Sequence, residues 1–454
     1  MLKFVKRAEK LYDVLIMHSY VVNGGKKLKG SITVNPSKNA SIAILIAALL
    51  NDKETVIKNL PKIEEVFRVI EVIESLGAQT EWKDDHVFKI TPPKEITLKN
   101  LNVEAALKTR IMILLIGVLA HKFKNFSLPF SGGCKLGRRT IMPHIYALEN
   151  FGINIKVVKN KYEVSHDGLK PCDNVIMYES GDTATENAIL AASMIEGKTV
   201  LKFASANYQV QDVCFFLKKL GVRFEGMGGT TLTIHGKKSL SKKIDFSVTE
   251  DPIEAMFFIS TAIVTKSSIV IKRCPIEFLE LELFKLKKMG FKFNVGKEYK
   301  SSNGYSRLVD IETFPSNLSA PCEKIYGRPF PGLNIDNLPF FAPIATQAKG
   351  ETLVHDWVFE NRAIYFMELG KMGANITLAD PHRVFIKGPV KLKPADIVSI
   401  PALRPSAIML VAMLGAKGKS ILRNVYIIER GYEDLCGRLK SIGSDIERVT
   451  NDKY

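Results

Sequence analysis

Six copies of one short pattern recur along the chain, and they constrain its fold more than any other feature. In each copy an apolar, helix-forming stretch ends in a bulky residue and a glycine, and an alternating run follows. The glycines are Gly77, Gly152, Gly221, Gly290, Gly373 and Gly443, so they lie 75, 69, 69, 83 and 70 residues apart. A period of this length indicates repeated βα subdomains rather than a solenoid of short repeats.

Each copy predicts the same order of elements. A β-rich run comes first, a helix such as 63–76 follows with apolar residues at helical spacing, and the glycine caps that helix in the left-handed region. The β-rich runs are 54–57, 124–127, 198–201, 268–271, 351–354 and 419–422. An alternating strand such as 153–157 and a second helix complete the unit. A strand near 20–22 precedes the first full copy, so we expect it to complete the last one.

Six units divide naturally into two groups of three. We therefore predict an α/β protein of two lobes, one formed by residues 38–248 and the other by residues 1–37 and 249–454, with ligands bound between them. The spacing of 83 falls in the second lobe, where residues 299–321 have the composition of an inserted loop.

The bulk composition favours some classes of partner over others. The net charge is +17, and it indicates either a lysine-rich surface without a specific role or an anionic ligand. Because the lysines are dispersed and no nucleic-acid-binding motif accompanies them, we expect no nucleic-acid partner. The longest apolar stretches are too short to cross a bilayer, so we expect a cytoplasmic protein without a membrane partner. The six cysteines form no CxxC pair, and we expect no metal site. The oligomeric state stays open.

Two segments have the composition of reactive or anion-binding loops. Residues 131–139 combine three glycines with Cys134 and several cations, which favour the thiolate form of a cysteine. Cys134 is either a general acid or nucleophile in this loop, or an incidental surface thiol. Lys38 lies at an expected helix start, where amide donors, the helix dipole and an ammonium together form a seat for phosphate.

Five further side chains are candidates for the same chemistry. Arginines lie at or near expected helix starts in four places and together suggest a cage for a polyanion. They are Arg110, Arg362, Arg404 and Arg430. Asp336 ends a proline-rich loop, where it is either a helix N-cap or a general base.

The segments that carry these residues resemble the UDP-N-acetylglucosamine 1-carboxyvinyltransferase family, the enolpyruvyl transferases of peptidoglycan synthesis. The resemblance covers nearly the whole chain and rests on motifs in the family's order and spacing, namely 37–40, 132–137, 185–187, 358–362 and 430–433. The related 5-enolpyruvylshikimate-3-phosphate synthases lack the cysteine loop and the Arg-Gly-Tyr-Glu ending. The resemblance implies two inverse α/β barrels, each of three βαβαββ units, with the active site between the two domains.

The resemblance also implies a reaction and its residues. The substrates would be phosphoenolpyruvate and a UDP-sugar, the sugar 3-hydroxyl would attack C2 of phosphoenolpyruvate, and no cofactor would be needed. Cys134 would protonate C3, Asp336 would be the base, and Lys38 and Arg430 would complete the catalytic set. The substrate-binding positions would be Asn39, Arg110, Arg139, Thr140, Ile141, Met142, Pro143, Val358, Arg362 and Arg404.

The chain departs from the family pattern mainly on the nucleotide side. Met142 replaces a carboxylate, Glu179 and Asp182 lie in the expected diphosphate segment, and residues 207–209 replace an acidic Glu-Pro-Glu. Ala402 replaces an aspartate before Arg404. Two alternatives to UDP-N-acetylglucosamine transfer therefore stay open: the same chemistry on another sugar nucleotide, and a non-catalytic protein that binds polyanions.

Overall fold

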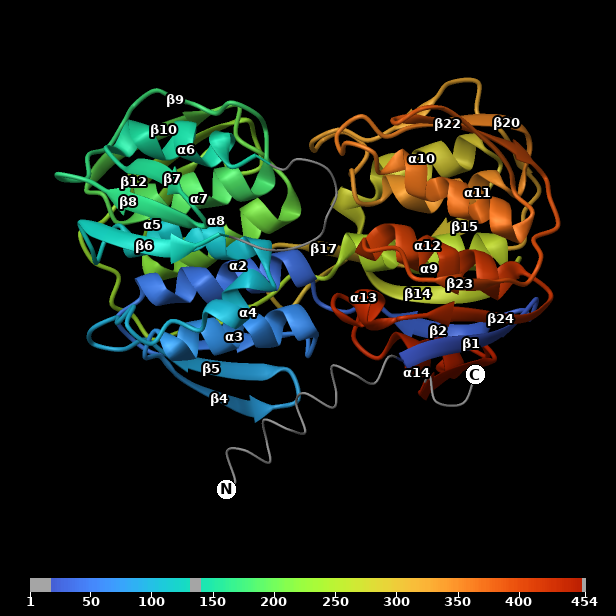
Figure 1. The fold of residues 1–454 in the computed structure, drawn as a ribbon, viewed down its shortest axis with the longest axis horizontal. Coiled ribbons are helices and arrows are strands. Elements are labelled where there is room, and N and C mark those ends of the chain that lie inside the picture. The colour runs from blue at the N-terminus through green and yellow to red at the C-terminus, as the bar shows by residue number, and fades with distance from the viewer. Residues whose placement is uncertain (1–17, 131–139, 451–454) are drawn as a thin grey trace.

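Two lobes lie side by side in the computed structural model, which describes residues 18–130 and 140–450 (Figure 1). Each lobe has helices in its middle and strands around them. In the first lobe the inner helices are α2 (Lys38–Ala47), α7 (Asp182–Ser193) and α8 (Tyr208–Leu220), and in the second they are α9 (Pro252–Val264), α11 (Phe341–Ala345) and α12 (Leu403–Gly415). Every residue of α9 is buried, as expected of a helix that is apolar on all sides. This placement of helices inside sheets is the inverse α/β arrangement that the resemblance implies.

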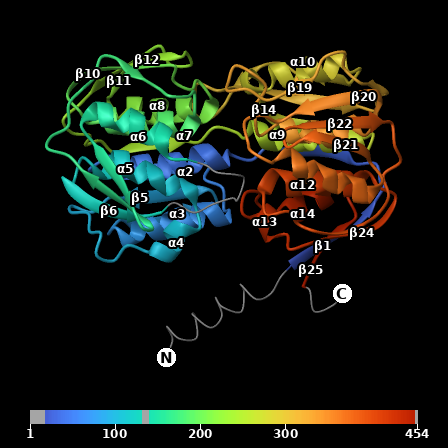
Figure 2. The same cartoon turned by 45° about the horizontal axis from the view of Figure 1, so that its top comes forward.

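The described strands form six separate sheets around these helices, three in each lobe (Figure 2). One strand of each sheet corresponds to one of the β-rich runs in the sequence. These strands are β3 (Thr55–Lys58), β6 (Asn125–Pro129), β10 (Gly197–Lys202), β14 (Ser268–Pro275), β20 (Ala348–His355) and β24 (Gly418–Arg423). The six-unit prediction is therefore confirmed. The described strands do not pair from one sheet to the next, so the sheets do not merge into a closed barrel.

The six repeated glycines all end helices. Their φ angles lie between 80° and 104°, which is the left-handed region that a residue with a side chain rarely adopts. The helices before them are α3 (Glu64–Ser75), η3 (Glu149–Phe151), α8, α10 (Glu280–Lys288), η6 (Ala363–Met372) and α14 (Leu435–Ser441). The strands after them are β4 (Gln79–Asp84), β7 (Asn154–Val158), β11 (Arg223–Glu225), β15 (Lys292–Val295), β21 (Asn375–Asp380) and β25 (Ile446–Thr450).

The N-terminal strand completes the last unit. In the first five units the strand after the glycine pairs antiparallel with a strand that follows it along the chain. In the fourth unit the two-residue strand β16 (Tyr299–Lys300) lies between these partners and also pairs with β17 (Arg307–Phe314). In the sixth unit β1 (His18–Gly24) takes that place, because it pairs antiparallel with both β24 and β25 (Figure 2). The expectation for residues 20–22 is confirmed, and the two ends of the described chain share one sheet.

The chain crosses between the lobes twice within the described residues. One crossing lies between β2 (Lys29–Thr33) and α2, and the other between β13 (Ile244–Ser247) and α9. The two crossings run antiparallel: the Ser37 amide donates to the Thr249 carbonyl at 2.7 Å, and the Asp251 amide donates to the Asn35 carbonyl at 2.8 Å. A two-stranded hinge of this kind joins the lobes.

The inserted loop expected at 299–321 is wrong in its bounds. Residues 307–314 form β17 (Arg307–Phe314), a central strand of its sheet, and the extra residues lie in the 296–306 connection before it. The other hairpin connections are the shorter segments 85–86, 159–160, 226–230 and 381–382. Asp310 and Glu312 alternate with the buried Val309, Ile311 and Thr313, as in a strand with one buried face. The serines, the Asn-Gly pair and the prolines around this strand give the whole segment the composition of a loop.

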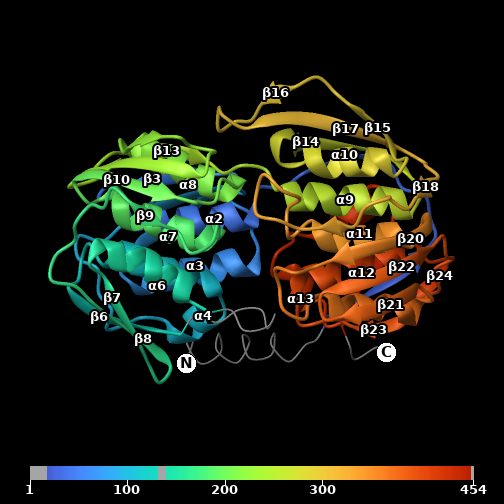
Figure 3. The same ribbon diagram turned by 90° about the horizontal axis from the view of Figure 1, so that it is seen from above.

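The 296–306 connection extends from the second lobe towards the first (Figure 3). The Tyr305 ring stacks on Phe215 of α8 with centroids 3.6 Å apart, and its hydroxyl donates to Asp212. Ser306 exchanges a hydrogen bond of 2.8 Å with Thr249 in the hinge. The connection therefore ties the second lobe to both the hinge and the first lobe. None of the described helices is long and apolar enough to cross a membrane.

Candidate active site

Lys38 is the first residue of α2, as the sequence predicts. Ser37 caps this helix, since its side chain accepts a hydrogen bond from the Ala40 amide at 3.3 Å. The Lys38 ammonium forms an ion pair of 2.8 Å with Glu65, near the start of α3. Burial alone would raise the pKa of the Glu65 carboxyl, but Lys38 and Arg430 hold that pKa below its ordinary value.

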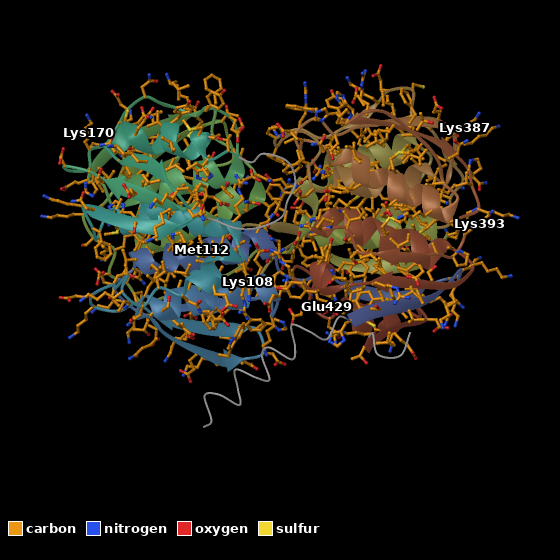
Figure 4. The ribbon with its side chains drawn as sticks, viewed as in Figure 1. Lys108, Met112, Lys170, Lys387, Lys393 and Glu429 are labelled. Carbon is orange, nitrogen blue, oxygen red and sulfur yellow. The ribbon has the colours of Figure 1, made fainter. Side chains whose placement is uncertain are left out.

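The segment 430–433 of the second lobe makes contact with the first lobe around Lys38. Arg430 donates to the Lys108 carbonyl at 3.3 Å, and Glu433 accepts from the Lys62 amide at 3.0 Å. Figure 4 shows Lys108 on the first lobe and Glu429, which immediately precedes Arg430, on the second lobe where the two approach each other. A Cβ atom on Gly431 would lie 3.1 Å from the Cδ atom of Lys38, so only glycine fits there without displacing its neighbours. The Arg-Gly-Tyr-Glu motif thus places its residues against the lysine of the other lobe.

The expected position of Arg430 at a helix start is wrong. It directly follows the short helix α13 (Tyr426–Glu429). The other three arginines lie as expected, because Arg110 begins η2 (Arg110–Leu114), Arg362 precedes η6, and Arg404 is the second residue of α12.

Asp336 lies between two arginine side chains. Its Oδ1 atom is 3.5 Å from Nη1 of Arg362, and its Oδ2 atom is 3.5 Å from Nε of Arg404. Asp336 is not a helix cap, since the following short helix η5 (Leu338–Phe340) is preceded by Asn337. Its side chain is about a quarter exposed, so one carboxylate is held in a defined place and still reaches solvent.

Arg362 is buried and anchors the loop that carries Asp336. Its guanidinium binds Asp356 through two hydrogen bonds and donates to the Ile335 carbonyl at 2.6 Å. Its ring neighbour is Phe359, whose centroid is 4.2 Å from the guanidinium carbon. With only 1% of its side chain exposed, Arg362 contacts this loop and not bulk solvent.

Arg404 is also buried, and it connects Asp336 to the motif at 430–433. It donates to the hydroxyl of Tyr432 at 2.9 Å. Ala402, which precedes α12, is fully buried. The guanidinium of Arg404 has Tyr432 and Asp336 as its acceptors, and the alanine at 402 has no polar side-chain atom to offer it.

The remaining predicted binding residues spread over the first lobe and the loop after β20. Arg110 donates to the Thr140 carbonyl at 3.2 Å, and Asn39 donates to the Tyr208 hydroxyl at 3.4 Å. Thr140 and Met142 are exposed and Val358 is half-buried. Ile141 and Pro143 are buried at the start of α6 (Met142–Leu148), so only their backbones are available to a ligand. Cys134 and Arg139 lie outside the described residues.

The structure adds two acidic residues, Glu65 and Asp356, to those that the sequence singles out, and it shows the partners of Asp182 in the expected diphosphate segment. Glu65 binds Lys38, and Asp356 binds Arg362. Acidic residues near a helix start or a strand end are too common in sequences to indicate such contacts. Asp182, in the first turn of α7, accepts hydrogen bonds from Ser205 at 2.6 Å and Asn207 at 2.9 Å. Burial raises the pKa of Asp182, and those two hydrogen bonds partly offset the rise.

Comparisons with known proteins identify the family. Residues 22–439 match the EPSP synthase (3-phosphoshikimate 1-carboxyvinyltransferase) family. The UDP-N-acetylglucosamine 1-carboxyvinyltransferase of Treponema denticola is 35% identical over 432 residues, which are 95% of this chain and 99% of the relative. That of Borreliella burgdorferi is 32% identical over 435 residues, with the same shares covered. The chain belongs to the UDP-N-acetylglucosamine 1-carboxyvinyltransferase family, within the EPSP synthase superfamily.

Solved structures of other enolpyruvyl transferases have the same fold as this family member. The enolpyruvyl transferase NikO from Streptomyces tendae aligns with a TM-score of 0.83 and 22% identity, and the alignment covers 96% of this chain and 99% of NikO. EPSP synthase from Acinetobacter baumannii aligns with a TM-score of 0.72 and 18% identity, covering 95% of this chain and 100% of that one. The two-lobed enolpyruvyl transferase fold is thereby confirmed.

Proposed function

We propose that the chain transfers the enolpyruvyl group of phosphoenolpyruvate to the 3-hydroxyl of UDP-N-acetylglucosamine and releases phosphate, the first committed step of peptidoglycan synthesis. Its support is the name shared by relatives that match over 95% of the chain. The structural observation that carries it is the meeting of Lys38 and the segment 430–433 across the two lobes. This meeting gathers cations from both lobes around one place, as a substrate with both a phosphate and a carboxylate group requires.

The reaction assigns a task to each residue of the site. The 3-hydroxyl oxygen forms a bond to C2 of phosphoenolpyruvate while C3 gains a proton, which gives a tetrahedral intermediate. The C2–O bond to phosphate then breaks, C3 loses a proton and the enol ether forms. Asp336 accepts the hydroxyl proton, Cys134 delivers the proton to C3, and Lys38, Arg430 and the arginines of the site offset the charge that develops.

The proposal divides the remaining residues between the two substrates. Arg110, Arg139 and Arg404 hold the phosphate and carboxylate of phosphoenolpyruvate. Asn39, Met142 and Val358 face the sugar nucleotide with their side chains, and the 140–143 segment offers its backbone. We assign Arg362 a positioning role, because its guanidinium is buried against Asp356 and Ile335.

The division into domains and the setting are part of the same proposal. The two lobes, residues 38–248 and residues 1–37 with 249–454, are the two domains, and substrates bind between them. The protein works in the cytoplasm, where phosphoenolpyruvate and sugar nucleotides are made, without a cofactor and without a nucleic-acid partner. Figure 4 shows Lys170 on one lobe and Lys387 and Lys393 on the other pointing outward at different places, which fits a dispersed positive charge.

Phosphate release from phosphoenolpyruvate tests the function directly. The purified protein should release one phosphate for each enolpyruvyl group transferred to UDP-N-acetylglucosamine. Cys134→Ser and Asp336→Asn should each slow turnover by about a hundredfold or more, because each removes a proton-transfer group. A folded wild-type protein that releases no phosphate with this acceptor would contradict the proposal.

A second sugar nucleotide is the alternative acceptor, and Asp182 is the observation that favours it. Its carboxylate lies at the start of α7 in the segment where relatives are expected to bind a diphosphate, and a negative charge there opposes another. A panel of sugar nucleotides in the phosphate-release assay distinguishes the two acceptors. The highest kcat/KM with UDP-N-acetylglucosamine would exclude the alternative, and a higher value with another nucleotide would establish it.

A further inference from the structure

The carboxylate of Glu65 is bound on both oxygens by residues from two different elements of the first lobe. Its Oε2 atom is 2.8 Å from the Lys38 ammonium, at the start of α2. Its Oε1 atom accepts a hydrogen bond of 3.0 Å from the hydroxyl of Thr109, which directly precedes Arg110. One side chain thus connects the two places in the first lobe that carry predicted phosphoenolpyruvate ligands.

The same residue also contacts the second lobe. The Glu65 amide donates to the Arg430 carbonyl at 3.4 Å, and Arg430 helps to lower the pKa of the Glu65 carboxyl. Glu65 lies in the first turn of α3, where the helix dipole favours a carboxylate. Glu65 therefore binds Lys38, interacts with Arg430, and contacts Arg110 only through the preceding residue, Thr109.

We propose that Glu65 is a positioning residue, which holds the Lys38 ammonium and the segment before Arg110 in the geometry that binds phosphoenolpyruvate. This inference rests on the function proposed above. Lysine has a flexible stem of four carbons, so a free Lys38 would lose conformational entropy whenever it binds an anion. Both side chains of the pair are only 12% exposed, and the ion pair fixes the ammonium before the substrate arrives.

Glu65 acts through Lys38 and not by touching the substrate. A carboxylate in contact with the phosphate or carboxylate of phosphoenolpyruvate would be repelled. Its single negative charge also leaves a net positive charge among its cationic neighbours, since Lys38 and Arg430 together carry two. The pair therefore orients a cation without cancelling the attraction of the site for an anion.

Substitution of Glu65 tests this role through the two Michaelis constants. Glu65→Gln keeps the shape and removes the charge, so it should raise the KM for phosphoenolpyruvate about tenfold or more, as the loss of a charged hydrogen bond predicts. The KM for the sugar nucleotide should stay within about twofold, because the change acts on one substrate only. Glu65→Asp keeps the charge and should restore part of the affinity for phosphoenolpyruvate.

The control is Glu71→Gln on the same helix. It removes an ion pair of 2.7 Å with Arg68 and should leave the KM values of both substrates unchanged.

Several outcomes would overturn the inference. An active wild-type protein with an unchanged phosphoenolpyruvate KM in Glu65→Gln contradicts it while leaving the proposed function intact. Equal rises in both KM values with a lower melting temperature would reveal a merely structural role. A folded wild-type protein without transferase activity overturns the function and this inference together. If Glu65→Gln does not fold, Thr109→Val removes the second anchor without changing charge, and an unchanged phosphoenolpyruvate KM in that variant would also refute the proposal.

Discussion

Arg362 and Asp356 form a bidentate ion pair in which each side chain is only 1% exposed. The pair is in contact with the loop of the candidate base, Asp336. Arg362 also donates a hydrogen bond to the Ile335 carbonyl, and its Nη1 atom lies 3.5 Å from Oδ1 of Asp336. A base that must accept a proton from a hydroxyl needs a fixed position. The buried pair supplies that position from beneath the loop.

Loss of Asp356 should therefore affect both stability and catalysis. Asp356→Asn leaves the buried Arg362 guanidinium with only the more distant carboxylate of Asp336 as a counter-charge, and we expect a loss of about 3 kcal/mol in the free energy of unfolding. The kcat should fall as well, because the Asp336 loop loses its anchor. Urea unfolding and phosphate release measure the two effects.

The surface pair of Arg423 and Asp396 provides a matched control for that experiment. It has the same bidentate geometry, with distances of 2.8 and 2.6 Å, but both side chains are partly exposed. Asp396→Asn should cost less than about 1 kcal/mol, since solvent screens an exposed pair. Equal losses in the two variants would mean that burial does not strengthen the Arg362 pair.

Gly431 is expected to be intolerant of even one added carbon. A Cβ atom there would lie 2.5 Å from Leu403 and 3.1 Å from the stem of Lys38. Gly431→Ala should therefore displace Lys38 and raise the KM for phosphoenolpyruvate severalfold. The second change Leu403→Ala should relieve part of the effect, because it removes the nearer obstacle.

Gly370→Ala is the control for the glycine experiment. Its added Cβ would meet only an ordinary contact, 3.7 Å from Ile376. We expect kinetics like those of the wild type. A Gly431→Ala enzyme that also behaves like the wild type would show that the segment 430–433 can move away from Lys38 without loss.

The sequence predicts the fold far better than it predicts the contacts of the site. The repeated glycines mark helix ends where the backbone must adopt a left-handed conformation. Because glycine is the residue that adopts this conformation most readily, a single glycine in the sequence is enough to indicate such an end. That is why six units and the completing strand β1 could be predicted. The position of Arg430 after a helix could not be predicted, because α13 has only four residues and no side chain caps its start.

Long-range polar partners escape prediction for a different reason. The sequence indicates Lys38 and Arg362 but not their partners Glu65 and Asp356, since a local pattern does not determine which carboxylate a cation contacts in the folded chain. Apolar positions in the binding motif show the same limit. Ile141 and Pro143 belong to a nucleotide-binding motif by resemblance, and the structure buries both side chains.

Tyr305 should contribute strongly to stability, although it lies in an inserted connection. Its ring stacks on Phe215 of the other lobe with an interplanar angle of 13°. Tyr305→Ala removes this stack, and we expect a loss of about 2–4 kcal/mol in the free energy of unfolding. Tyr305→Phe keeps the ring and should cost less.

Tyr299→Ala is the control in the same connection, because Tyr299 is 38% exposed and its hydroxyl binds Asp310 within the second lobe. Similar losses for Tyr305→Ala and Tyr299→Ala would contradict a special role for the contact between lobes.

Asp212 accepts a hydrogen bond from the Tyr305 hydroxyl, and its titration should make the free energy of unfolding depend on pH. Burial raises the pKa of its carboxyl to about 7, while hydrogen bonds from Tyr305 and the Thr249 amide limit the rise. The unfolded chain titrates near pH 4, so between about pH 4 and pH 7 the folded protein binds the extra proton and is stabilised by it. This stabilisation decreases as pH rises towards 7, and above pH 7 the buried charge costs on the order of a few kcal/mol relative to pH 4. The variant Asp212→Asn tests this dependence.

Asp212→Asn removes the titrating carboxyl, and its amide oxygen can still accept the hydrogen bond from the Thr249 amide. The difference in unfolding free energy between variant and wild type should therefore shift in favour of the variant from pH 5 to pH 8, as measured by urea unfolding at each pH. A difference that stays constant across this range would show that Asp212 does not titrate there.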